Sequence, residues 1–285
     1  MDSTTLPPLF ISHGSPMTAI EPREAGAFMQ ALGPAIEAAF GRPKAIVVAS
    51  AHSLTREPAL LAAPRHEAVY DFGGFDDKLY TLRYDAPGAP ALAARVETLV
   101  RGAGLPVHVS GEGGLDHGIW TPLRYMFPEA DIPVLPLAWP PNWSPAQLFA
   151  LGQALSPLSA EGVLVIGSGS ITHNLRRVFA SGLRPPAGQA ATPESSAFRN
   201  WFAQRSAARD WEALFDYRAQ APHAVLMHPT DEHLLPWYVA AGAGGRDHAA
   251  LRLHDSLVYG DLGMDIYAFG AQAPQLATAL AAVPD

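Results

Sequence analysis

Short, almost uninterrupted apolar runs such as IVVAS and VLVIG, separated by longer stretches of helical character, most strongly limit what this chain can fold into. Such runs are typical of strands that helices cover on both faces. Their alternation with helices indicates an α/β sheet that is mixed but mostly parallel. We predict strands at Leu9–Ser12, Ala45–Ser50, Val107–Ser110, Val134–Ala138, Val163–Gly167, Ala249–His254 and Ile266–Phe269.

The stretches between these runs contain the signals that start helices. Pro145 follows a serine and Pro193 follows a threonine, which is the order expected for an N-cap residue followed by the first helical residue. A further helix is expected after Gly270. We predict the other helices at Ala25–Phe40, Pro90–Gly102, Pro145–Leu155, Pro193–Ala208 and Glu232–Ala241.

The chain has no internal repeat and no Ser/Gly linker, so we predict a single catalytic domain over residues 1–285. The Gly- and Pro-rich stretch Ser181–Ala190 is interpreted as a surface loop and not as a domain boundary. The start of the chain lacks the basic region and apolar length of a signal peptide. No apolar run approaches the ~20 residues needed to cross a bilayer. We therefore expect a cytoplasmic protein without membrane contact.

Composition excludes several functions. The formal net charge of −8 makes the surface repel phosphate backbones, which argues against nucleic-acid binding. The absence of cysteine removes disulfides, thiolate metal sites and cysteine nucleophiles. The 11 histidines are left as the expected metal ligands and proton carriers.

Three histidines share one topological position. His13 follows PLFIS, His52 follows AIVVASA and His173 follows VLVIGSGSIT, so each lies just past the end of a predicted strand. Ligands of open α/β sheets bind at the carboxyl ends of the strands, where such loops converge. One histidine in such a place is more often a structural loop residue. Three of them, in a chain without cysteine, favour a shared site, and Gly14 allows a tight turn beside His13.

Further histidines lie near acidic residues. His117 follows Asp116, and HPTDEHLLP places His228, Asp231, Glu232 and His233 near a predicted helix start, within reach of a metal. Five others have no comparable setting and are expected to be structural or exposed: His66, His108, His223, His248 and His254.

Known catalytic motifs of other classes are missing. Neither GEGGLDHG nor GSGSITHN has the GxGxxG or Walker A spacing, and GxSxG and HExxH do not occur. A hydrolase built on Ser168 or Ser170 has no supporting pattern.

Six motifs, in order, carry a resemblance to a known family: FISHGSPM, VVASAHSLT, YDFGGFDDKLYTLRYDAPGAP, LDHGIW, GSGSITHNLR and PTDEHLLP. Together they resemble the class III extradiol ring-cleavage dioxygenases, in the branch of the 4,5-DOPA extradiol dioxygenases, related to the catalytic subunit of protocatechuate 4,5-dioxygenase. The resemblance runs from about Pro8 to Phe269. It implies a three-layer α/β/α domain, which agrees with the pattern of strands and helices.

The resemblance also implies a set of site residues. A non-haem Fe(II) would be held by His13, His52 and His233, with Zn(II) as a possible ion in the isolated protein. His173 would be the acid/base histidine and a possible fourth ligand in the zinc form. His117 would contact the substrate.

The chemistry implied is ring opening of a catechol. Three protein ligands leave positions on Fe(II) free for a catechol and O₂. Neutral His173 could then take and return a proton. A DOPA-like catechol would yield a ring-opened semialdehyde.

The third ligand is open on general grounds. Two histidines and one carboxylate are common in non-haem iron sites, which favours Glu232. His233 is favoured because it matches the PTxEH motif of the family, and because neighbouring helical residues project ~100° apart, so that only one faces the ion.

Three positions depart from the family pattern. Ser53 and Tyr70 stand where an aromatic residue and a histidine are common, and His228 stands where asparagine is common. His228 could be a spare ligand, a proton carrier or a loop residue capping the next helix. Two other functions use the same histidines: a zinc-dependent hydrolase, and a metal-binding protein without catalysis.

Overall fold

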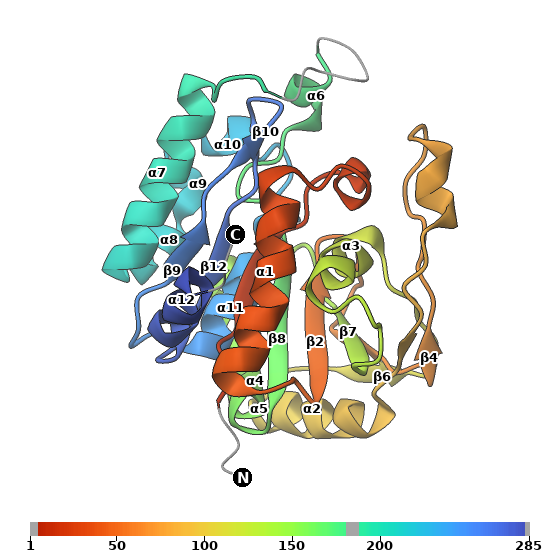
Figure 1. The fold of residues 1–285 in the computed structure, drawn as a ribbon. Coiled ribbons are helices and arrows are strands. Elements are labelled where there is room, and N and C mark those ends of the chain that lie inside the picture. Colours follow the sequence, from red (N-terminus) through yellow and green to blue (C-terminus); the bar gives the residue numbers. More distant parts are fainter. Residues whose placement is uncertain (1–4, 181–187, 283–285) are drawn as a thin grey trace.

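A mixed eight-stranded sheet forms the centre of the molecule (Figure 1). It is seen in a computed structural model that describes residues 5–180 and 188–282. The strand order is β6-β3-β7-β2-β8-β1-β12-β9. The bounds are β1 Leu9–Ser12, β2 Ala45–Ser50, β3 Ala59–Leu61, β6 His108–Ser110, β7 Val134–Ala138, β8 Val163–Gly169, β9 Leu251–His254 and β12 Ile266–Ala268.

The middle of this sheet is parallel and its borders are not. Strands β7, β2, β8 and β1 run parallel to one another. Strand β12 is antiparallel to β1, β9 to β12 and β3 to β7, whereas β6 is parallel to β3. The carboxyl ends of the four middle strands therefore meet at one edge. Two small ribbons accompany the sheet: β4 Arg65–His66 with β5 Ala86–Pro87, and β10 Leu257–Val258 with β11 Leu262–Gly263.

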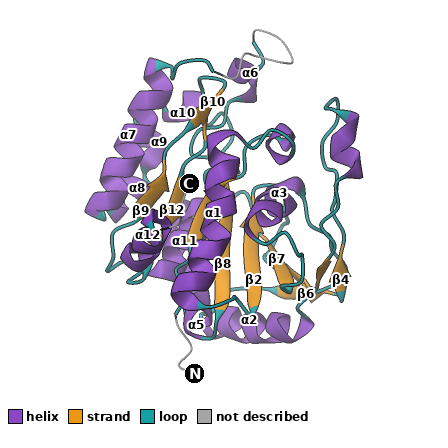
Figure 2. Ribbon diagram, viewed as in Figure 1, coloured by secondary structure: helices purple, strands orange, loops and turns teal. Residues whose placement is uncertain are grey.

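Helices cover both faces of the sheet (Figure 2). The described helices are η1 Pro16–Ala19, α1 Arg23–Phe40, η2 Asp77–Thr81, α2 Pro90–Gly102, α3 His117–Met126, α4 Pro145–Leu155, α5 Pro157–Ala160, α6 Leu175–Val178, α7 Pro193–Ala208, α8 Trp211–Phe215, α9 Tyr217–Gln220, α10 Ala224–Met227, α11 Pro236–Gly244 and α12 Ala273–Ala281.

Side-chain alternation along the strands divides the interior into two cores. Leu9 and Ile11 of β1 pack with α1, α3 and α12, whereas Phe10 packs with α4 and α11 on the opposite face. Successive strand residues point to opposite faces, so a strand buried on both sides has to be apolar throughout. The predicted three-layer α/β/α fold with a mixed sheet is confirmed.

Several boundaries follow the sequence closely. Strands β1, β2 and β7 and helices α2, α4 and α7 have the predicted bounds. The Ser144 side chain accepts a hydrogen bond from Gln147 N, and that of Thr192 accepts one from Ser195 N. These are the N-caps that the Ser-Pro and Thr-Pro pairs predicted.

Other predictions were wrong in detail. Strand β8 continues two residues further, to Gly169, and helix α3 was missed because its sequence carries Gly118 and an internal Pro122. Helix α11 begins at Pro236 and not at Glu232. The remaining strands and helix α1 differ by one or two residues at an end. The short strands β3, β4, β5, β10 and β11 were not predicted, because each has too few residues to show a periodic pattern.

Two further predictions concern the surface. Gly188–Ala190 lie outside helices and strands, as expected of a loop, and residues 181–187 of the predicted loop lie outside the described residues. Among the described residues, no helix combines the length and apolar character needed to cross a membrane. The extent of the domain over all of residues 1–285 and the cytoplasmic location stay predictions.

Glycines allow α4 and α11 to pack backbone against backbone. A Cβ on Gly152 of α4 would lie 2.0 Å from Val239 O of α11, and one on Gly242 would lie 2.0 Å from Phe149 O. On β8, a Cβ on Gly169 would lie 1.9 Å from His233 O. Because backbone atoms cannot move aside as a flexible side chain can, these glycines fix how closely α11 and its leading turn approach the sheet.

We expect Gly152→Ala to lower the free energy of unfolding by about 1–3 kcal/mol, the usual cost of overpacking a tight interior. Gly102→Ala is the matched control, because a Cβ on Gly102 in α2 meets nothing within 4 Å. Chemical denaturation of both variants measures the difference. Equal stability of the two would contradict the backbone contact.

Candidate active site

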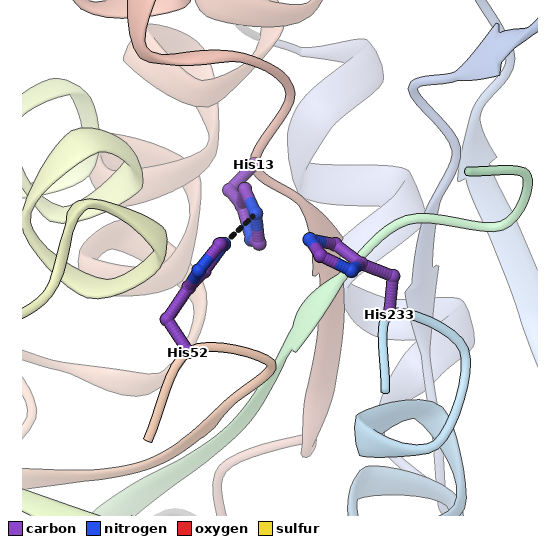
Figure 3. A group of neighbouring side chains, drawn as sticks. All are labelled: His13, His52 and His233. Atoms are coloured by element: carbon purple, nitrogen blue, oxygen red, sulfur yellow. Dashed lines mark hydrogen bonds between the residues drawn. The ribbon is translucent and has the colours of Figure 1, made fainter. Parts of the chain in front are cut away.

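Five histidines meet at the carboxyl edge of the parallel strands. His13 follows β1, His52 follows β2, His173 follows β8, His117 begins α3 and His233 lies in the turn before α11. Ring centroids of His13 and His52 are 5.1 Å apart, those of His13 and His233 5.5 Å, and those of His52 and His233 5.0 Å. In Figure 3 these three rings point toward one another.

His13 is fixed by its backbone and by one ring nitrogen. Its amide donates to Gly169 O over 3.0 Å, and Gly14 adopts a left-handed φ of 74° directly after it. The ring atom Nδ1 lies 2.9 Å from Ser168 Oγ, and that hydroxyl donates its own proton to Gly118 O. Ser168 therefore has to accept, so the His13 proton sits on Nδ1 and Nε2 keeps its lone pair.

One carboxylate serves both His52 and His117. Asp71 Oδ2 lies 3.3 Å from Nδ1 of His52, and Asp71 Oδ1 lies 3.0 Å from Nδ1 of His117. Oδ1 also accepts a hydrogen bond from the backbone N of His117 at 3.0 Å. A carboxylate next to Nδ1 holds the proton there, which leaves Nε2 of His52 free, 3.2 Å from Nε2 of His13.

His233 is arranged in the same way. Its Nδ1 lies 3.0 Å from Glu232 Oε1, whose position is supported by a hydrogen bond from Thr230. The argument from helical geometry was wrong, because both residues lie in a turn before α11 and their side chains touch. In this arrangement Glu232 is an acceptor for His233, which is a common role of carboxylates beside metal-binding histidines.

The three free nitrogens suit a divalent metal ion. One ring nitrogen from each of His13, His52 and His233 lies within 4.8 Å of the others. Neutral imidazoles with the second nitrogen held by a hydrogen-bond acceptor are the usual donors for iron and zinc. The donor set therefore fits the ion that the family resemblance implied. Two adjoining groups, His52–Asp71–His117 and His173–Glu232–His233, have similar spacing.

Burial keeps the rings of His13, His52, His173 and His233 neutral. Burial first, and then the neighbouring histidines, lower the pKa of His13 and of His233 well below the usual value of 6.5. Burial followed by His117 lowers the pKa of His52 to about 4, and burial lowers that of His173 to about 3. For Asp71, burial alone would raise the pKa, but the hydrogen bond and charge of His117 outweigh it and lower the pKa to about 2. Asp71 is therefore ionised at pH 7.

His173 lies beside the three-histidine group. Its ring stacks on that of His233 with centroids 3.4 Å apart and planes 9° apart, and its amide donates to Met227 O. The loop before it is held by Thr172, whose hydroxyl donates to Asp261 O and accepts from Gly263 N. This position, next to the candidate ligands but on a separate loop, suits a group that handles protons.

His228 has a structural place. It is fully buried behind the His173 loop, and its Nε2 lies 2.7 Å from Ile171 O, to which it donates. It follows the last residue of α10 and does not cap the next helix. Its Nδ1 is buried without a hydrogen-bond partner, and among the described residues His228 belongs to none of the side-chain groups that could hold a metal ion, which does not favour a spare ligand.

The other histidines and the serines follow expectation. His66 is buried, His254 is half-buried, and His108, His223 and His248 are exposed. Ser168 and Ser170 are buried and donate to backbone carbonyls, so neither is placed as a nucleophile. Sequence reasoning missed Asp71 and Ser168 as partners of the site histidines. Asp71 stood in the motif YDFGGFDDKLY, but its carboxylate had no visible partner there.

Comparison with known proteins places the chain in a family. The family described as the catalytic LigB subunit of aromatic ring-opening dioxygenase matches residues 7–270. A 4,5-DOPA dioxygenase extradiol from Beta vulgaris is 39% identical over 262 residues, covering 91% of this chain and 95% of that protein. One from Escherichia coli (strain K12) is 36% identical over 249 residues, covering 85% and 87%.

A solved structure agrees in fold. The crystal structure of an uncharacterized protein from Escherichia coli K12 superposes with a TM-score of 0.73 at 29% sequence identity. The match covers 93% of this chain and 100% of that one.

We expect the metal-free protein to lose stability as the pH falls from 7 toward 4. In the unfolded chain, histidines bind protons below about pH 6.5. In the folded chain His52 and His228 do so only near pH 4, and the pKa of His13 and His233 is also lowered. The unfolded state binds more protons in this window, so the free energy of unfolding falls by up to about 1.4 kcal/mol per pH unit and histidine.

Chemical denaturation at pH 7 and pH 5 measures this slope. His228→Gln is the informative variant, because a glutamine amide can still donate to Ile171 O but does not titrate. Its slope should be shallower than that of the parent protein. A free energy that stays constant or rises toward pH 5 would exclude neutral buried histidines.

Proposed function

Because this chain belongs to the family of the catalytic LigB subunit of aromatic ring-opening dioxygenases, we propose that it cleaves a DOPA-like catechol at one Fe(II) held by His13, His52 and His233. The observation that carries this proposal is the convergence of three histidine nitrogens whose second nitrogen is held by Ser168, Asp71 or Glu232. Zn(II) can occupy the same neutral donors in isolated protein.

Family membership makes the chain an extradiol ring-cleavage dioxygenase, and its relatives indicate the substrate class. Proteins named 4,5-DOPA dioxygenase extradiol from a plant and a bacterium match over most of their length. We therefore propose a small catechol and O₂ as the substrates and a ring-opened semialdehyde as the product. The sequence alone left a zinc-dependent hydrolase as an alternative function. Membership of the dioxygenase family favours extradiol ring cleavage over it.

The chain's own residues handle the protons. When bound, the ion would favour the deprotonated form of the catechol hydroxyls and bring O₂ next to the ring. His173 is neutral at pH 7 because burial lowers its pKa to about 3, so it has a free lone pair to accept a hydroxyl proton. The same burial makes its protonated form costly, which helps it to return the proton to the opening ring.

His117 has a different task in this proposal. In the neutral ring Nδ1 donates to Asp71, which leaves Nε2 as a hydrogen-bond acceptor. Its ring centroid lies 4.1 Å from that of His52 and 5.3 Å from that of His13. An acceptor beside the ion would orient a catechol hydroxyl by binding its proton.

The single most direct test is reconstitution with Fe(II) under anaerobic conditions, followed by oxygen-electrode assays with a series of catechols including DOPA. We expect oxygen uptake that depends on Fe(II) and on the catechol, and loss of the bound metal in His13→Ala and His52→Ala. Metal analysis showing full occupancy in both variants, or no oxygen uptake with any catechol, would refute the proposal.

His173→Ala should keep most of the metal and slow ring cleavage by ~10²–10⁴-fold, the usual contribution of a proton-transfer group. The exposed His248→Ala is the control and should match the parent protein in both respects. Wild-type turnover in His173→Ala would make His173 a spectator. Loss of metal instead would make it a ligand.

The third ligand is decided by comparing His233→Ala with Glu232→Gln. We expect His233→Ala to lose the ion. Glu232→Gln should keep it with ~10–100-fold weaker affinity, because a glutamine oxygen can still accept from Nδ1 but carries no charge. Loss of iron in the Glu232 variant alone would show that the carboxylate is the ligand.

A further inference from the structure

Asp71 contacts His52 and His117 and belongs to an arm of the chain that is rich in aromatic residues. We define this aromatic arm as residues 69–82; it includes η2. Within it, Tyr70 donates through its hydroxyl to Leu82 O over 2.6 Å, and Tyr80 donates to Phe72 O. These two hydrogen bonds join the beginning of the arm to its end.

The base of the arm is fixed to α3. Val69 N donates to Leu115 O over 2.7 Å, and the Trp120 indole donates to Val69 O over 3.0 Å. On the other side of Asp71, the Phe72 ring meets the His117 ring edge-on at 5.6 Å. The chain is therefore held on both sides of Asp71, through Val69 and through Phe72.

We propose that Asp71 is a positioning residue that fixes the proton of both His52 and His117 on Nδ1, so that each presents an unprotonated Nε2 to the site. The proposal rests on His52 being a ligand of the proposed metal site. It follows from three contacts of one carboxylate: Oδ2 to His52 Nδ1 at 3.3 Å, and Oδ1 to His117 Nδ1 and to His117 N, both at 3.0 Å.

An asparagine at this position could not do the same. A carboxylate has two acceptor oxygens, whereas an amide has one oxygen and one NH₂ group. The backbone N–H of His117 needs the oxygen, so the NH₂ group would face Nδ1 of His52. His52 would then have to accept at Nδ1 and carry its proton on Nε2, the atom that should bind the metal.

This reasoning gives an unusual order of effects. Asp71→Asn keeps the size and shape of the side chain, so a space-filling role predicts that it is milder than Asp71→Ala. Control of the proton predicts the reverse, because in Asp71→Ala water can still accept from His52 Nδ1. We expect Asp71→Asn to weaken zinc binding by ~10–100-fold, the usual range for a partner of a metal ligand, and Asp71→Ala to weaken it less.

The test is competition for Zn(II) between the metal-free protein and a chromophoric chelator. Asp76→Ala is the matched control: it lies in the same arm, where its side chain accepts from Lys78 N, and it touches neither histidine in the described contacts. The control should bind zinc like the parent protein. Asp71→Asn binding as tightly as the parent, or more tightly than Asp71→Ala, would overturn the proposal.

A second measurement uses the unaltered chain and does not depend on how the variants fold. Nitrogen chemical shifts of the histidine rings in metal-free protein report which nitrogen carries the proton. His52 and His117 should both be protonated on Nδ1, and protonation of either on Nε2 would overturn the proposal. Failure of the metal site itself is recognised separately, because the parent protein would then bind no zinc or His13→Ala would bind it equally well.

Discussion

The acceptor beside each Nδ1 is the interaction on which the site depends. A neutral imidazole has one protonated and one free nitrogen, and only the free one can bind a metal ion or take a proton. Ser168, Asp71 and Glu232 each lie at Nδ1 of a different histidine. They come from β8, from the aromatic arm and from the turn before α11. Elements distant in sequence thus have to be in place before three nitrogens can converge.

The same strand that supports the chemistry also sets the packing. Strand β8 carries Ser168, which accepts from His13, and Gly169, whose carbonyl accepts from His13 N. Gly169 has no side chain, so the backbone of His233 lies where a Cβ would be. The small residues at the end of β8 therefore have two roles. Gly169 allows the turn that carries His233 to approach closely, and Ser168 and Gly169 form hydrogen bonds with His13.

Much of this could be predicted from the sequence, and the limits have physical causes. The bounds of β2 were predicted correctly from its apolar run, and those of α4 from its Ser-Pro start. Both signals are local, because they lie in the residues of the element itself. The positions of His13, His52 and His173 after strands predicted their convergence. The partners of their rings could not be predicted, because Asp71 and Ser168 meet the histidines only through tertiary packing. Helix α11 was placed too early because its apolar pattern does not mark where the preceding turn ends.

Ser53 shows how a departure from the family pattern can leave the proposed ligands unchanged. Its hydroxyl and that of Ser50 each donate over 2.7 Å to Asp116, one to each carboxylate oxygen. Burial raises the pKa of Asp116, and the two hydroxyls oppose that rise by stabilising the charged form. With both oxygens in use, Asp116 makes no side-chain cap on α3. An aromatic residue at position 53 would leave Asp116 one donor fewer, so the serine changes how the loop carrying His52 is anchored to α3. The nitrogen that His52 would offer to the proposed ion is set by Asp71 and not by this serine.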